Sequence, residues 1–231
     1  MSLKLFRNTE FVQSSLISHT RESQAMHPAA LIVLASVWIA VLGNLTLWQT
    51  LLQLPAEGVI QVLLRCLILG LQIALALAAL LSLLAWRWLL KLAVVLLLIL
   101  SAVAMMSMQG GVPYIDTPAM DKMLKGGLRA WLARSDPTWI LPGLALLVVP
   151  LLWLLPTPVR RLGLLRQLLC NLIILVVSVA LLLGLAYLFA GENRVLMQVH
   201  PMLYEQLNPL SSLHALGRLA WDLLPAGVAP R

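Results

Sequence analysis

Long apolar runs separated by short polar connections dominate the pattern along this chain. The longer runs approach twenty residues, which is about the length that an α-helix needs to cross roughly 30 Å of hydrocarbon. The pattern predicts five membrane-spanning helices. Four of them cover about 29–52, 59–85, 139–155 and 168–189, and the third in chain order follows the connection 86–91 and ends near 108. In the span 139–155, Pro142 suits the first helical turn and Pro150 predicts a kink. The ten-residue alternation of an outer-membrane barrel is absent, so we expect an all-α, polytopic membrane protein.

The composition supports this class. Of the 231 residues, 61% are hydrophobic and only 11% are charged, and the mean hydropathy is +0.94. The net charge of +7 comes from cations that stand at the ends of the apolar runs. Such cations set orientation and contact anionic lipids, so we expect a lipid partner and no nucleic acid.

A long polar segment, residues 109–138, interrupts the pattern between the third and fourth spans. Thr117 and Pro118 resemble a helix start, with Thr as the cap and Pro in the first turn. Residues 119–133 can then form an amphipathic helix, because apolar side chains recur at steps of three and four. These positions are Met120, Met123, Leu124, Leu128, Trp131 and Leu132.

The cations of this segment group along the other side of the predicted helix. Lys122, Lys125 and Arg129 are therefore candidates to hold a lipid phosphate in a re-entrant or interfacial helix. The alternative is an ordinary interfacial helix whose cations touch head groups without specificity. Both interpretations put the segment at the membrane surface.

Candidate catalytic and metal-binding residues are missing from the sequence. The carboxylates all lie outside the centres of the predicted spans, which argues against an ion-coupled transporter. His200, Glu205 and His214 match no metal-binding spacing, so we expect structural roles for them. Cys66 and Cys170 form no pair with such a spacing, so we expect them to be buried free thiols.

Charges in the short connections predict the orientation. The second connection carries Arg87 and Lys91, and the fourth carries Arg160, Arg161 and Arg166, so both should face the cytoplasm. Residues 1–27 are then a cytoplasmic tail, in which Met26 is a second candidate start, and residues 191–231 are a periplasmic surface or bridging segment. The basic segment 109–138 would be periplasmic, against the charge rule, because it is long enough to form a helix of its own.

Four short motifs stand in a fixed order around the predicted spans. They are Asn-Leu-Thr at 44–46, Trp-Arg-Trp-Leu-Leu-Lys at 86–91, Arg-Arg-Leu-Gly-Leu at 160–164, and Asn-Pro at 208–209 followed by Leu-Gly-Arg-Leu-Ala at 216–220. Together they resemble the N-terminal transmembrane domain of the membrane phosphoethanolamine transferases that modify lipid A, which include the colistin-resistance enzymes. The resemblance extends over about residues 29–220.

The resemblance implies a five-helix domain in the bacterial inner membrane with a cytoplasmic N-terminus. In that family a periplasmic sulfatase-like domain follows, with zinc and a threonine nucleophile that takes phosphoethanolamine from phosphatidylethanolamine and passes it to lipid A. That domain is missing here, so we expect no catalytic residue, no metal ligand, no cofactor and no transferase activity from this chain alone. Phosphatidylethanolamine is the candidate lipid, and a separate sulfatase-like domain is the candidate partner.

The polar segment departs from the family's pattern. The family carries Asn, Thr and Glu at successive four-residue steps after an Asp, a set implied to hold the head group of the donor lipid. Asp116 matches the Asp, but the following positions fall near Lys122, Gly126 and Ala130. The candidates for head-group binding are therefore Asp116, Thr117, Lys122, Lys125 and Arg129.

Two hypotheses on function follow. In the first, the chain is the membrane domain of a phosphoethanolamine-transferase-like protein that binds phospholipid at the periplasmic leaflet and anchors or pairs with a catalytic domain. In the second, it is a non-catalytic membrane scaffold or regulatory partner. A sulfatase-like partner protein favours the first hypothesis, whereas unrelated partners favour the second.

Cysteine labelling tests the predicted orientation. A membrane-impermeant maleimide added from the periplasmic side should label a Thr117→Cys variant, whereas a Thr157→Cys variant should react only after the membrane is opened, because 157 lies in a connection predicted to be cytoplasmic. The reverse pattern would contradict the orientation.

Overall fold

The computed structural model describes residues 25–53, 58–109, 117–118, 120–121, 125–126, 137–160, 163–199, 203 and 206–222. Within these residues the named elements are α-helices, and the one isolated bridge pairs Met26 with Val159. The predicted all-α class is therefore confirmed. The expected tail at residues 1–24 lies outside the described residues.

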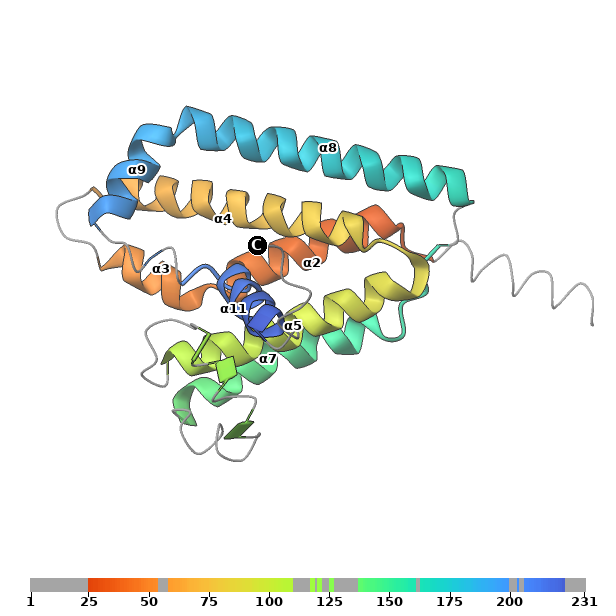
Figure 1. The fold of residues 1–231 in the computed structure, drawn as a ribbon, viewed down its shortest axis with the longest axis horizontal. Helices are drawn as coiled ribbons and strands as arrows, with labels where there is room; N and C mark the ends of the chain where they lie inside the picture. The colour runs from red at the N-terminus through yellow and green to blue at the C-terminus, as the bar shows by residue number, and fades with distance from the viewer. Residues whose placement is uncertain are drawn as a thin grey trace, which may run out of the picture.

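Eight helices follow one another along the described chain. They are α2 (Pro28–Leu42), α3 (Leu45–Leu52), α4 (Val59–Leu83), α5 (Arg87–Gln109), α7 (Pro137–Leu154), α8 (Leu164–Leu188), α9 (Ala190–Val199) and α11 (Leu210–Asp222). The long helices run up and down as a bundle in which α4 lies between α8 and α2, while α5 and α7 lie side by side (Figure 1). The short helix α11 contacts α5.

Three of the described helices are long and apolar enough to cross a membrane: Val59–Leu83, Leu89–Met108 and Leu164–Leu188. The pair α2 and α3, which meet at an angle of 48°, passes the same test as one broken span. The fourth predicted span corresponds to the apolar helix Thr138–Leu154, which is shorter than the length required. The membrane character is thus confirmed, whereas the count of five spans stays a prediction.

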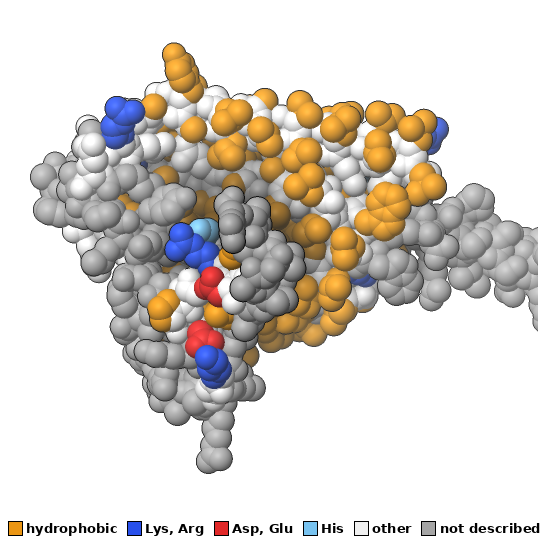
Figure 2. Space-filling model, in the orientation of Figure 1, with side chains coloured by type: hydrophobic (Ala, Val, Ile, Leu, Met, Phe, Trp, Pro, Cys, Tyr) orange, Lys and Arg blue, Asp and Glu red, His pale blue; other side chains and the backbone are white. Residues whose placement is uncertain are grey.

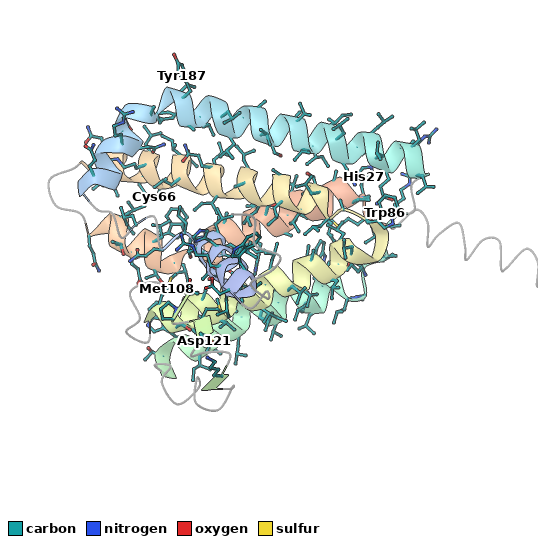
Figure 3. All side chains as sticks on the ribbon, viewed as in Figure 1. His27, Cys66, Trp86, Met108, Asp121 and Tyr187 are labelled. Carbon is teal, nitrogen blue, oxygen red and sulfur yellow. The ribbon has the colours of Figure 1, made fainter. Side chains whose placement is uncertain are left out.

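The core of the bundle runs along α2, α4 and α5. Ile32, Ile39, Leu77, Leu81 and Leu98 are all at most 1% exposed. In contrast, only 6% of the apolar window of α8 is buried, and Tyr187 near its end points away from the bundle (Figure 3). The broad apolar band on the surface of the helices in Figure 2 suits contact with lipid tails.

One end of the bundle is tied by backbone hydrogen bonds that join distant parts of the chain. The Met26 N–H donates to the Pro158 carbonyl at 2.9 Å, and the Arg160 N–H donates to the Met26 carbonyl at 2.9 Å. We call this the Met26–Val159 end. His27 and Trp86 lie at the same end (Figure 3), so the start of α2 and the α4–α5 connection are found there together with the α7–α8 connection.

Side chains add to this network. The Lys91 ammonium donates to the Thr157 carbonyl at 2.8 Å and to the Leu155 carbonyl at 3.4 Å, just beyond the end of α7. The Gln167 amide donates to the Ala85 carbonyl at 2.6 Å, and the Asn171 amide reaches the same carbonyl at 3.0 Å. The connections that were predicted to share the cytoplasmic side therefore share one end of the bundle, while the side of the membrane it faces stays a prediction.

The start of α7 differs from the expectation. The sequence placed Pro142 in the first turn of a span starting near 139, whereas the helix begins at Pro137 and holds both Pro142 and Pro150 in its interior. The first-turn placement was wrong because Pro137 takes the first helical position, where the missing N–H costs nothing. Pro150 lacks the N–H that would bond the Leu146 carbonyl. The Trp38 indole of α2 donates to that carbonyl instead, at 3.1 Å.

Gly43, which follows α2, lies in close contact with Ser101 of α5. A Cβ atom at this position would clash with the Ser101 Oγ and would lie 2.5 Å from the Ile39 carbonyl oxygen. We therefore expect Gly43→Ala to lower the free energy of unfolding by about 1–3 kcal/mol, the usual cost of overpacking. Thermal unfolding in detergent measures this, with Gly184→Ala as the control because nothing lies within 4 Å of its Cβ position. Equal melting temperatures for the two variants would contradict the assignment.

Candidate functional site

The chain breaks between α2 and α3 in the middle of an apolar segment, and side chains donate to the carbonyls of Ala40, Val41 and Gly43 at the break. The Asn44 amide donates to the Ala40 carbonyl at 3.0 Å and to the Ile39 carbonyl at 3.4 Å, so it caps the end of α2. The Trp48 indole donates to the Val41 carbonyl at 2.7 Å. A membrane helix can be interrupted only where the backbone groups are satisfied in this way.

Asn208 supplies the donor for the break itself. Its amide donates to the Gly43 carbonyl at 2.8 Å, to the Ser101 carbonyl at 2.8 Å and to the Ser101 Oγ at 3.2 Å. Its backbone N–H donates to the Asn44 Oδ1 at 2.8 Å, while the Asn44 amide donates back to the Asn208 carbonyl at 2.8 Å. Asn208 is 0% exposed and Asn44 is 1% exposed. Residues 164 positions apart are thus joined by a reciprocal bond pair.

A second contact supports this junction. The Thr50 hydroxyl of α3 donates to the Gln206 side-chain oxygen at 3.3 Å, and Gln206 is 9% exposed. Leu203 is buried in the main core at 2% exposure. The segment that leads into α11 is therefore attached to the α2–α3 break at several points.

The helix α11 follows directly and lies over the end of α5. Its sequence is amphipathic, and Ser212 and Ala215 form its buried face. Ala215 packs in a small apolar cluster with Ala104 and Met108 of α5 and with Met120 of the polar segment. The polar segment, the end of α5 and α11 therefore meet at one place.

A cleft of about 550 Å³ lies between α11 and the polar segment. Thr117 lines it on one side, and His214, Gly217, Arg218, Trp221 and Asp222 line it on the other. The volume is typical of clefts that bind small ligands. Figure 2 shows cationic, acidic and histidine side chains gathered over the region of α11.

The lining residues offer complementary chemistry. The Arg218 guanidinium can donate several hydrogen bonds to a phosphate, and the Thr117 hydroxyl can donate one more. The Asp222 carboxylate can accept from an ammonium group. The Trp221 ring, 52% exposed, has the amphipathic character that suits the interface between lipid tails and water.

The structure places only part of the predicted set at this cleft. Pro118 is helical, as expected, but Thr117, which was expected to be the cap, is helical as well, and it lines the cleft. Lys125 does not line it: its ammonium pairs with Asp121 at 2.6 Å, and its side chain is 75% exposed. Met120 is 4% exposed, so this member of the predicted apolar stripe lies on the bundle.

Asp116, Lys122 and Arg129 lie outside the described residues. Figure 3 shows Asp121 near Met108, close to the end of α5.

Sequence reasoning missed the contribution of α11. His214 was expected to be structural, and Arg218, Trp221 and Asp222 were not considered as ligand residues. A signal was present, because His214, Arg218 and Asp222 stand at successive four-residue steps and must share one face of a helix. Within the described residues, no group of histidine, cysteine and acidic side chains could hold a metal ion.

Comparison with solved structures identifies a similar fold. The chain is similar to the integral membrane protein lipooligosaccharide phosphoethanolamine transferase A (EptA) from Neisseria meningitidis, with a TM-score of 0.70 and 18% sequence identity. The match covers 84% of this chain and 36% of that protein, so the chain spans about a third of its length. At this identity the likeness concerns the fold. No curated protein sequence matches the chain significantly.

Comparison with protein families adds a match in sequence. The N-terminal model of the family described as phosphoethanolamine transferase EptA/EptB matches residues 73–222, well over half of the chain. This region includes α5, α7, α8 and α11, and so both sides of the cleft. The chain therefore belongs to the phosphoethanolamine transferase EptA/EptB family.

Proposed function

We propose that this chain is a phospholipid-binding membrane domain that receives a head group in the cleft between Thr117 and α11. In this proposal the membrane is the bacterial inner membrane, the cleft faces the periplasmic leaflet, and the lipid is phosphatidylethanolamine. The observation that carries the proposal is the lining of the cleft by a cation, an acid and an interfacial Trp, Arg218, Asp222 and Trp221.

Charge favours a zwitterionic head group. A phosphate would be held by Arg218 and Thr117, and the ammonium of the same head group would be held by Asp222 one helical turn beyond Arg218. His214, one turn before Arg218, adds a further donor on the phosphate side when its ring N–H points into the cleft. The departure of the polar segment from the family's Asn, Thr and Glu set then matters less, because α11 supplies the charged groups.

The domain would also anchor or pair with a sulfatase-like catalytic domain. The related protein from Neisseria meningitidis is named as a phosphoethanolamine transferase, and this chain matches about a third of it. The segment that leads into α11 is attached to the bundle through Asn208, which would fix the cleft relative to such a partner. Zinc and the nucleophile would belong to the partner domain.

Removal of the cation tests the head-group site. We expect Arg218→Gln to weaken binding of a fluorescent short-chain phosphatidylethanolamine to the detergent-solubilised protein by about tenfold, because a charge-assisted hydrogen bond to phosphate is lost. Arg194→Gln on α9 is the matched control, since Arg194 is exposed and does not line the cleft. If both variants bind as the wild type does, the cleft is not the head-group site and the scaffold hypothesis gains.

Removal of the junction tests how the cleft is held. Asn208→Ala leaves the Gly43 and Ser101 carbonyls without this donor, at a cost of about 1–3 kcal/mol for each carbonyl. We expect hydrogen exchange in residues 210–222 to become about tenfold faster or more, while exchange in α4 stays unchanged. Asn193→Ala on α9 serves as the control, and unchanged exchange in α11 would show that the helix is held in another way.

A further inference from the structure

A second opening lies in the apolar part of the bundle, far from the α11 cleft. It is a groove of about 220 Å³ between α2, α5 and α7, lined almost entirely by apolar atoms. Its floor is formed by Leu31, Leu98 and Leu154, each at most 2% exposed. Leu34 and Trp153 stand at its outer edge and are 50% and 46% exposed, so the groove opens outwards from the bundle.

The geometry of α7 explains why the groove exists. Pro150 lines the groove and leaves the Leu146 carbonyl without its helical donor. The Trp38 indole of α2 bonds that carbonyl at 3.1 Å and draws the two helices together at one point. Beyond this bond, towards the Met26–Val159 end, α2 and α7 leave room between them that no described side chain fills.

The other end of the groove is cationic. Lys91 lies one turn before Val94, which lines the groove, and its ammonium contacts the Leu155 and Thr157 carbonyls directly after the groove-lining Leu154. Arg160 is exposed, and its backbone N–H bonds the carbonyl of Met26, five residues before Leu31 of the groove. An apolar channel thus runs towards two cations at the end of the bundle.

We infer that this groove holds one acyl chain of a bilayer phospholipid, whose phosphate lies at Lys91 and Arg160. Along α2 the groove extends from Leu31 to Trp38, about 10 Å of helix, which matches part of an acyl chain rather than a whole lipid. Dry apolar cavities of about 150 Å³ already bind hydrocarbon ligands, and this groove is larger.

Charge complementarity favours a phospholipid over another apolar occupant. A free helix from a partner protein would have to leave the Lys91 ammonium without an anion, whereas a phospholipid satisfies the apolar channel and the cationic end with one molecule. The site is independent of the proposed head-group cleft, because Val94 and Met108 on α5 are separated by almost four helical turns, about 21 Å.

Photolabelling of the wild-type chain in lipid nanodiscs tests the inference directly. A phosphatidylglycerol with a diazirine in its acyl chain is added in trace amounts, irradiated, and the labelled residues are mapped by mass spectrometry. We expect labelling to concentrate on residues 31–38 and 149–154, and to be competed by unlabelled phosphatidylglycerol but not by diacylglycerol, which lacks the phosphate. Labelling of α8 at the same level, or equal competition by diacylglycerol, would overturn the inference.

A variant whose groove is filled by a larger side chain provides the matched comparison with the wild type. Ala35→Phe puts a ring into the groove and should reduce the specific labelling about tenfold, because about two methylene groups of the chain are expelled. Ala180→Phe on α8 is the control, since Ala180 is exposed and does not line the groove. Equal labelling of the two variants contradicts the proposed site.

Ala35→Phe should leave unchanged the binding of the fluorescent short-chain phosphatidylethanolamine that tests Arg218. This measurement separates failure of the present inference from failure of the proposed function.

Discussion

The reciprocal hydrogen bonds between Asn44 and Asn208 hold the α11 end of the molecule together. They join the break in the first apolar segment to the segment that leads into α11. Asn208 also donates to the Gly43 and Ser101 carbonyls, so α2, α5 and the α11 segment meet at one buried side chain. A single interhelical bond in a membrane is worth only about 0.6 kcal/mol on average. The junction is decisive because its loss strands several buried polar groups together, at about 1–3 kcal/mol each.

The position of α11, and therefore the shape of the cleft, depends on this junction. The helix α11 has 13 residues, close to the length below which an isolated helix is marginal in water. Its apolar contacts with Ala104, Met108 and Met120 form a small cluster beside the main core. Such a cluster alone would hold the helix loosely. Asn208, two residues before the helix begins, fixes its start, and the face that carries His214, Arg218 and Asp222 is then directed to the cleft.

The sequence was a good guide to the helices and a poor one to the site. Apolar runs report their own length and composition, so α4, α5 and α8 could be predicted to within a few residues. The motifs at 44–46 and 208–209 were each recognised, but their mutual contact was not, because nothing local connects residues 164 positions apart. The cations of the polar segment were predicted to bind a head group, yet Lys125 pairs with Asp121 at the surface. The charged face of α11 was readable from its four-residue steps, but its place beside Thr117 depends on the fold.

One physical device explains both openings in the bundle. Where the backbone of a membrane helix is irregular, a carbonyl loses its donor, and the irregularity can persist only if another element supplies one. At the α2–α3 break that donor is the Asn208 amide, and at Pro150 it is the Trp38 indole. Each bond joins two elements at one point. The apolar groove lies beside the second bond, and the cleft lies along the helix α11, whose start the first bond holds. What the opening can hold then follows from its lining: charged side chains of α11 on one side of the bundle, and apolar side chains ending at Lys91 on the other. A polar head group and an acyl chain are therefore the ligands that these two openings suit.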